Sequence, residues 1–181
     1  MHIRQLKASG LVLVVLFALS ACSQTVPPDN LTEGSLFPPL IFTGLDGKEV
    51  PVDSFRGKLV VLNIWSTWCG PCRRELPSLE RLHHIVDPQR FVIAALSVDN
   101  DIIQAREYLI DKGISFTSYI DKDMKITRDI FDIRIFPDTL LISPRGVLLR
   151  RVAGERVWDD PKVVKALEEA YDGKNDMLGE I

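Results

Sequence analysis

Cys69 and Cys72 are separated by Gly70 and Pro71, and this C-x-x-C spacing can form a redox disulfide or supply half of a metal site. Thiol-disulfide exchange needs one thiolate that attacks and a second that resolves the mixed disulfide. His83 is the histidine closest to the pair along the chain, and eleven helical residues would separate it from Cys72 by roughly 16 Å. We therefore favour redox chemistry over a metal site, expect no cofactor, and interpret His83 and His84 as helix-surface residues.

The residues on either side of the pair predict a strand followed by a helix. The nearly continuous apolar run Leu59–Trp65 is typical of a strand that is buried on both faces. After Pro71, which suits an early helical position, the inward positions recur every three or four residues at Cys72, Leu76, Leu79, Leu82 or His83, and Val86. Cys69 would then lie at the helix start, where unpaired N–H groups favour a thiolate. We predict that Cys69 attacks and that Cys72 resolves.

The rest of the chain alternates between strand and helix patterns. We predict a mixed sheet with helices on both faces, which is an α/β fold. The predicted strands are 40–42 and 49–52 around an Asp46-Gly47 turn, then 91–97, 116–120, 138–143 and 147–152; the predicted helices are 102–112, 124–131 and 161–171.

The amino terminus has the pattern of an export signal. The chain has 181 residues, 46% of them hydrophobic and 26% charged, which indicates one globular domain with appendages. Basic residues precede an apolar run over 11–21 that is too short to cross a membrane as a helix, so residues 1–21 are predicted to be a signal peptide. Leu19-Ser20-Ala21-Cys22 resembles the lipobox of bacterial lipoproteins, which implies a lipid on Cys22 and attachment to a bilayer. Ordinary cleavage nearby would instead leave Cys22 as a free thiol.

The predicted domain lies between two irregular segments. Residues 22–39 are rich in proline and polar residues and are predicted to be a tether, followed by a domain over 40–172 and a frayed tail over 173–181. The formal charge is −3, and loss of Arg4 and Lys7 with the signal peptide makes it −5. Without a basic cluster, the chain is not expected to bind nucleic acid.

With Trp68-Cys69-Gly70-Pro71-Cys72 at a strand-to-helix junction, the sequence resembles the thioredoxin superfamily and, more narrowly, the TlpA/ResA group of extracytoplasmic thiol-disulfide oxidoreductases. Leu45–Lys48 together with Phe55–Lys58 resembles the lead-in hairpin of that group. The resemblance covers residues 34–171. It implies a thioredoxin-like sheet with an N-terminal hairpin and an extra βα unit between the thiol helix and Pro137.

The resemblance also points to residues around the cysteines. Pro137 matches the family's cis-proline, although by position alone it could equally be a trans proline that opens an edge strand. Phe136 would contact the substrate or belong to the core, and Trp68 would form a partly exposed wall of the site. Trp65, which ends the apolar run, is expected in the core.

Asn63 stands where thioredoxin places a buried acid, and an amide cannot take a proton from Cys72. We hypothesise that Asp99 or Asp101, in the loop after strand 91–97, tunes the thiols instead. Capping of the helix that begins at Ile102 is the competing interpretation of both acids. Glu75 and Glu80 are assigned to the solvated face of the thiol helix.

The resemblance implies a membrane-tethered oxidoreductase that reduces disulfides in exported proteins, with the apocytochrome haem-binding cysteine pair as an expected substrate. A membrane thiol donor would keep the pair reduced in an oxidising compartment. The alternatives are a disulfide oxidase or redox repair protein with the same fold, and a lipid-anchored metal-binding module. A peroxidase is disfavoured, because Leu62 and Ser66 stand where that family has proline and threonine.

Overall fold

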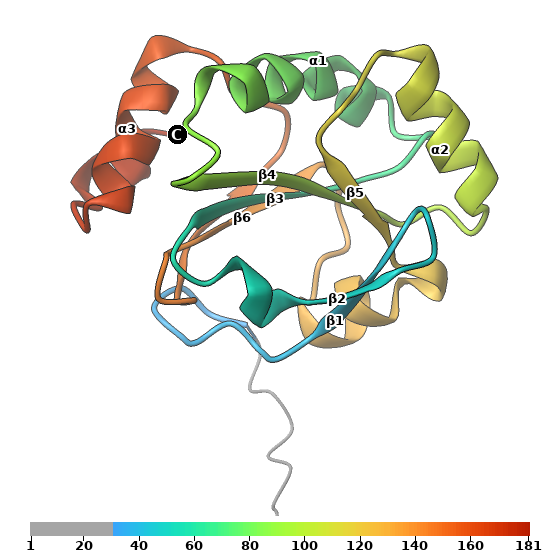
Figure 1. Ribbon diagram of the computed structural model, residues 1–181, viewed down its shortest axis with the longest axis horizontal. Helices are drawn as coiled ribbons and strands as arrows, with labels where there is room; N and C mark the ends of the chain where they lie inside the picture. Colours follow the sequence, from blue (N-terminus) through green and yellow to red (C-terminus); the bar gives the residue numbers. More distant parts are fainter. Residues whose placement is uncertain (1–30) are drawn as a thin grey trace, which may run out of the picture.

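Seven strands form one mixed sheet in the computed structural model, which describes residues 31–181 (Figure 1). The strand order across the sheet is β2-β1-β5-β4-β3-β6-β7. Neighbours among the three central strands are parallel, and the outer pairings are antiparallel. The strands are β1 (Ile41–Gly44), β2 (Glu49–Pro51), β3 (Leu59–Trp65), β4 (Phe91–Ser97), β5 (Thr117–Ile120), β6 (Asp138–Ile142) and β7 (Leu148–Ala153).

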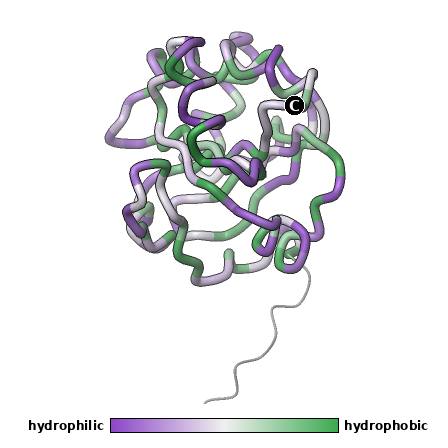
Figure 2. Tube along the Cα trace, turned by 90° about the vertical axis from the view of Figure 1, so that its right-hand side faces the viewer, coloured by the Kyte–Doolittle hydropathy of each residue, from purple (hydrophilic) through white to green (hydrophobic). Residues whose placement is uncertain are grey.

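Three α-helices cover one face of this sheet, and short helical segments cover the other (Figure 1). The first face carries α1 (Gly70–Ile85), α2 (Ile102–Asp111) and α3 (Pro161–Tyr171), whose inward residues join one hydrophobic cluster. The opposite cluster includes residues next to the π-helical η3 (Lys125–Ile130), which follows η2 (Lys122–Met124); η1 (Val52–Phe55) joins β2 to β3. In Figure 2 the helical turns alternate between hydrophobic and hydrophilic residues, as expected of helices that pack by one side.

The sheet register brings three loops to the edge that carries the cysteines. Trp65 at the end of β3 is paired with Ser97 at the end of parallel β4. Because β6 runs antiparallel to β3, its first residue Asp138 lies opposite Ile64. The turn before α1, the loop after β4 and the residues just before β6 therefore meet at one edge, as expected where parallel strands end in α/β sheets.

The amino-terminal segment packs on the domain earlier than the sequence suggests. Phe37 is buried and stacks on Phe131, with ring centroids 5.4 Å apart. Leu36 pairs with Val147, next to the start of β7. Backbone hydrogen bonds join residues 34–37 to the segment 146–148 at the edge of the sheet, so packed structure begins before the predicted domain start at residue 40. The predicted signal peptide, Cys22 and the tether up to residue 30 lie outside the described residues.

The carboxyl terminus is also packed, where the sequence predicts a frayed tail over 173–181. A 3-10 helix, η4 (Asp176–Glu180), follows α3, and Leu178 is buried in the same cluster as the α1 side chains. The sequence hides this contact, because a short segment with a few apolar residues has no periodicity. No helix between residues 31 and 181 has the length and hydropathy needed to cross a bilayer.

Candidate active site

A disulfide joins Cys69 and Cys72 at the first turn of α1, with their Cα atoms 5.3 Å apart. Cys69 is the N-cap of the helix: its backbone is extended, and its Sγ accepts a hydrogen bond from the Cys72 N–H at 3.2 Å. The unpaired N–H groups and the positive dipole end of a helix both stabilise a thiolate at this position. In the reduced pair, negative charge is therefore favoured on Cys69.

An aromatic edge lies beside the cysteines. The Trp68 side chain is 59% exposed and meets Phe136 edge-on, with ring centroids 5.9 Å apart. The Phe136–Pro137 peptide bond is cis, as the family resemblance implies. The register of β6 places Pro137 at the same sheet edge as the cysteines. Of the two cysteines, Cys69 is 6% exposed and Cys72 is fully buried.

Asn63 holds a carboxyl group of α1 inside the molecule. Its Nδ2 donates to Glu75 Oε1 at 2.6 Å and to Thr139 Oγ1 at 2.9 Å. Strand β3 thus has no buried acid of its own, but the amide of Asn63 binds the carboxyl group of Glu75 from α1.

The assignment of Glu75 to the solvated helix face is wrong, since the residue is only 1% exposed. Glu75 follows Cys72 by three positions and precedes Leu79 by four, so it lies on the inward stripe of α1. Its Oε2 accepts hydrogen bonds from the Arg156 N–H at 3.0 Å and from the Trp158 indole N–H at 3.3 Å. The spacing from Cys72 was the sequence signal that could have found this acid.

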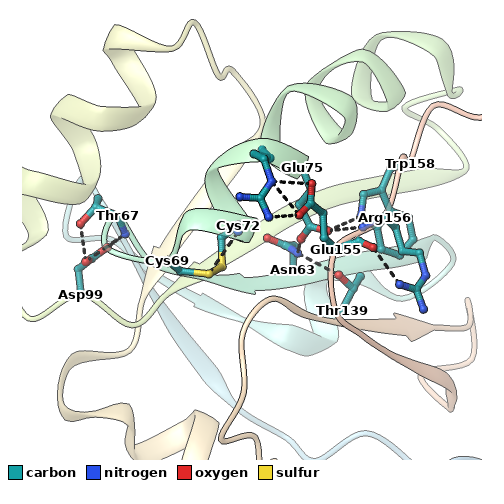
Figure 3. The surroundings of a disulfide bond; sticks show 11 residues. Asn63, Thr67, Cys69, Cys72, Glu75, Asp99, Thr139, Glu155, Arg156 and Trp158 are labelled. Carbon is teal, nitrogen blue, oxygen red and sulfur yellow. Dashed lines mark hydrogen bonds and ion pairs between the residues drawn. A yellow bond between two sulfur atoms is a disulfide. The ribbon is translucent and has the colours of Figure 1, made fainter.

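Burial raises the pKa of Glu75 to about 7, although hydrogen bonds from Arg156, Asn63 and Trp158 act in the opposite direction. The carboxyl group therefore changes charge near neutral pH, one helical turn beyond the inner cysteine. Figure 3 shows Glu75 and Asn63 on the Cys72 side of the disulfide and the pair Thr67–Asp99 on the Cys69 side.

Asp99 and Asp101 have different surroundings. Asp99 is buried and accepts hydrogen bonds from the Thr67 N–H at 3.0 Å, the Thr67 hydroxyl at 2.8 Å and the Ser97 hydroxyl at 2.8 Å. Asp101 is exposed and caps α2 by accepting from the Ile103 N–H at 2.8 Å. The capping interpretation therefore holds for Asp101, whereas Asp99 fixes the turn that leads to Cys69.

Glu80 is only partly solvated, since its side chain is 12% exposed. It accepts hydrogen bonds from the backbone N–H groups of Ser115 and Phe116, and it pairs with His84 at 2.9 Å. His83 packs edge-on against Phe116. Within residues 31–181 no cluster of three or more His, Cys, Asp or Glu side chains is arranged to hold a metal ion.

A redox-capable cysteine pair at the start of a helix, at the same sheet edge as a cis-proline and just after the central strand β3 of a mixed sheet, defines a thioredoxin-like redox protein. Residues 34–151 match the AhpC/TSA family, and the chain belongs to that family. Its curated relatives include thiol-disulfide oxidoreductases named ResA. The one from Bacillus subtilis (strain 168) is 29% identical over 149 residues, which cover 81% of this chain and 83% of the relative.

A second ResA, from Bacillus thuringiensis (strain Al Hakam), is 31% identical over 128 residues, which cover 71% of this chain and 73% of the relative. Among solved structures, the thioredoxin domain of a thiol-disulfide oxidoreductase from Bacteroides vulgatus aligns with a TM-score of 0.66 at 26% identity, over 78% of this chain and 99% of that one. A thioredoxin-family thiol:disulfide interchange protein from Chlorobium tepidum TLS shares the fold with a TM-score of 0.65 at 22% identity, over 75% of this chain and 97% of that one. The chain is a thiol-disulfide oxidoreductase of the ResA type.

Proposed function

We propose that the protein reduces disulfides in exported proteins, with Cys69 as the attacking thiol and Cys72 as the resolving thiol. The observation that carries this proposal is the place of Cys69 at the N-cap of α1, where its Sγ already accepts the Cys72 N–H. This position favours the thiolate that thiol-disulfide exchange requires. The greater exposure of Cys69 supports the same assignment.

The reaction consists of two exchanges. The Cys69 thiolate attacks a substrate disulfide, which forms a mixed disulfide and releases one substrate sulfur as a thiolate. The Cys72 sulfur, once deprotonated, attacks Cys69 Sγ, which releases the second substrate sulfur and closes the Cys69–Cys72 disulfide. Two electrons pass from the protein to the substrate, so a thiol donor must reduce the pair before the next cycle.

Glu75 is the group that takes the Cys72 proton in this proposal. It is buried one turn beyond Cys72 on the same helix, and its pKa is raised to about 7. A base whose pKa lies near the working pH can both accept and return a proton. Asn63 keeps the carboxyl group in place through its hydrogen bond to Oε1. Asp99 acts on the other side, where its bonds to Thr67 fix the turn before Cys69.

The substrate disulfide would lie against the aromatic edge formed by Trp68, Phe136 and Pro137. The exposure of Trp68, its edge-on contact with Phe136 and its position next to Cys69 in the chain support this assignment. The apocytochrome haem-binding cysteine pair is the substrate that we propose, on the family resemblance.

The site of action is proposed to be extracytoplasmic, with the protein held on a bilayer by a lipid on Cys22. The apolar run over 11–21 and the sequence Leu19-Ser20-Ala21-Cys22 support this. A membrane thiol protein would then be the electron donor, since the compartment outside the cytoplasm is oxidising.

Direction and substrate can be tested together. A Cys72→Ser variant should accumulate mixed disulfides on Cys69 with exported proteins, and these can be identified by mass spectrometry. The reduction potential of the wild-type pair should lie near that of thioredoxin, about −270 mV. A potential near that of DsbA, about −120 mV, would instead assign the protein as an oxidase.

A further inference from the structure

Trp158 lies in the loop of residues 154–160 between β7 and α3, but both of its N–H groups donate hydrogen bonds to α1. Its side chain is fully buried. Its backbone N–H donates to Ser78 Oγ at 3.0 Å, and its indole N–H donates to Glu75 Oε2 at 3.3 Å. Ser78 and Glu75 are one helical turn apart, so the tryptophan spans the inner surface of the thiol helix.

The same loop is fixed to the active-site region at several other points. Its first residue, Gly154, donates its N–H to the carbonyl oxygen of Pro137 at 2.8 Å. On the outside of the helix, Arg74 Nε lies 3.1 and 3.0 Å from the two carboxylate oxygens of Glu155. Arg81 makes a similar two-bond contact with Asp159 at 2.6 and 3.0 Å. Each exposed pair contributes little alone, but together with the buried bonds they keep the loop on α1.

The loop therefore supplies donors to one oxygen of Glu75 while Asn63 supplies a donor to the other. Oε2 accepts the N–H groups of Arg156 and Trp158, and Oε1 accepts Asn63 Nδ2 (Figure 3). Hydrogen bonds of this kind stabilise the ionised carboxylate and offset part of the penalty of burial. They lower the pKa of Glu75 from the higher value that burial alone would give.

The groups around Glu75 that carry charge or titrate are few. Cys72 and Arg74 are on its own helix, and Glu155 and Arg156 are on the loop. The charge of Glu155 raises the pKa of Glu75, but Glu155 is itself paired with Arg74. From the sheet, the side-chain hydrogen bond that reaches Glu75 within residues 31–181 comes from the uncharged amide of Asn63. The neutral donors are therefore the contacts best placed to adjust this acid.

We propose that Trp158 is a positioning residue of the redox site, whose indole N–H orients the Glu75 carboxylate and keeps it available to exchange a proton with Cys72. This inference rests on the proton-accepting role of Glu75 proposed above. Trp158 itself touches neither sulfur nor substrate in this scheme, and it acts only through Glu75.

The test is a Trp158→Phe variant, which keeps a buried aromatic ring but removes the N–H donor. The titration of Glu75 in the reduced protein can be followed by ¹³C NMR of its carboxyl carbon, assigned with Glu75→Gln. The midpoint should move upward by about one pH unit, since one donor to the ionised form is lost. Resolution of the mixed disulfide at pH 7 should slow by about fivefold and recover at alkaline pH, because fewer carboxyl groups are ionised at neutrality.

Trp65→Phe is the matched control. Trp65 is also fully buried, but its indole N–H has no hydrogen-bond partner within the described residues. Its loss should leave the Glu75 midpoint unchanged, even if packing is weakened. If Trp158→Phe does not fold, replacement of Trp158 by 3-benzothienylalanine removes the N–H while it preserves the shape of the ring.

The outcomes separate this inference from the proposed function. If Glu75→Gln leaves the pH profile of resolution unchanged, the role of Glu75 itself is refuted. If Glu75→Gln removes the step near pH 7 but neither Trp158 variant moves the midpoint, the role of Trp158 is refuted and that of Glu75 stands. A midpoint raised by both Trp158 variants and not by Trp65→Phe supports the proposal.

Discussion

Glu75 and Asp99 are buried on opposite sides of the disulfide, and their hydrogen bonds serve different parts of the site (Figure 3). Glu75 accepts hydrogen bonds from Asn63 of β3 and from the 154–160 loop, and its raised pKa allows it to accept and return a proton near neutral pH. Asp99 is bonded to Thr67, two residues before Cys69, by both the backbone and the hydroxyl group. Because its carboxylate accepts several hydrogen bonds from one turn, Asp99 fixes the geometry of the turn before Cys69.

Asp99→Asn should therefore destabilise the protein by about 1–3 kcal/mol, because an amide can accept fewer of these bonds and leaves a buried donor unpaired. The variant should also shift the titration of Cys69, since the Thr67 turn carries that residue. Urea denaturation and pH-dependent alkylation of the reduced protein measure the two effects. Asp101→Asn is the control: asparagine is as good an N-cap as aspartate, so neither quantity should change appreciably. Equal effects of the two substitutions would contradict the assigned difference.

At the scale of elements, two loops are joined to α1 by hydrogen bonds. The 154–160 loop bonds to its residues 74, 75, 78 and 81, and the turn after α2 bonds to Glu80. Glu80 accepts the N–H groups of Ser115 and Phe116 just before β5, so a single carboxylate connects the helix with the neighbouring strand. Burial by itself would raise the pKa of Glu80, but the hydrogen bonds from Ser115, Phe116 and His84 together outweigh it and the pKa is lowered.

Glu80→Ala should cost about 1–3 kcal/mol at pH 7, since two backbone N–H groups and a hydroxyl lose their acceptor. Because the pKa of Glu80 is lower in the folded state, its contribution is fully present above the unfolded value and is lost as the pH falls through the folded value. The difference between variant and wild type should therefore shrink in acid, below about pH 4.5. Chemical denaturation at pH 7 and at pH 3.5 measures it. Glu107→Ala, at an exposed position of α2, should show no comparable loss at either pH.

At the scale of the whole molecule, the two ends of the described chain add to the two hydrophobic clusters on opposite faces of the sheet. Phe37 belongs to the cluster beneath the sheet, and Leu178 belongs to the cluster under α1 and α3. The domain therefore extends further at both ends than its regular strands and helices suggest.

Leu178→Ala should lower the free energy of unfolding by about 2–3 kcal/mol, the lower part of the range for removing a buried leucine side chain, because the residue lies near the end of the chain. For a domain of this size, that corresponds to a fall in Tm of roughly 5–10 °C. Thermal unfolding followed by circular dichroism measures the change. Glu180→Ala alters an exposed residue of the same segment and should leave Tm nearly unchanged. If Leu178→Ala also left Tm unchanged, the carboxyl terminus would not be packed in solution.

The sequence by itself determined the features that depend on local pattern. The apolar run of β3, the stripe of α1 and the C-x-x-C spacing follow from neighbouring residues, so the position of the disulfide at the helix start was predictable. The same is true of the hairpin turn at Asp46-Gly47, where Gly47 has a φ of +84° that glycine adopts without strain.

Only the tertiary structure decided which polar side chains meet at the disulfide. A glutamate between two arginine residues and a leucine is exposed in most helices, so local pattern assigned Glu75 to solvent. Its burial depends on a loop 81 positions later in the chain, whose Arg156 N–H reaches Glu75 Oε2. By local sequence alone, Asp99 and Asp101 could each cap α2. The pairing of β3 with β4 brings Asp99 to Thr67 instead. Local periodicity fixes the elements and their faces, whereas contacts across the sheet edge depend on long-range packing.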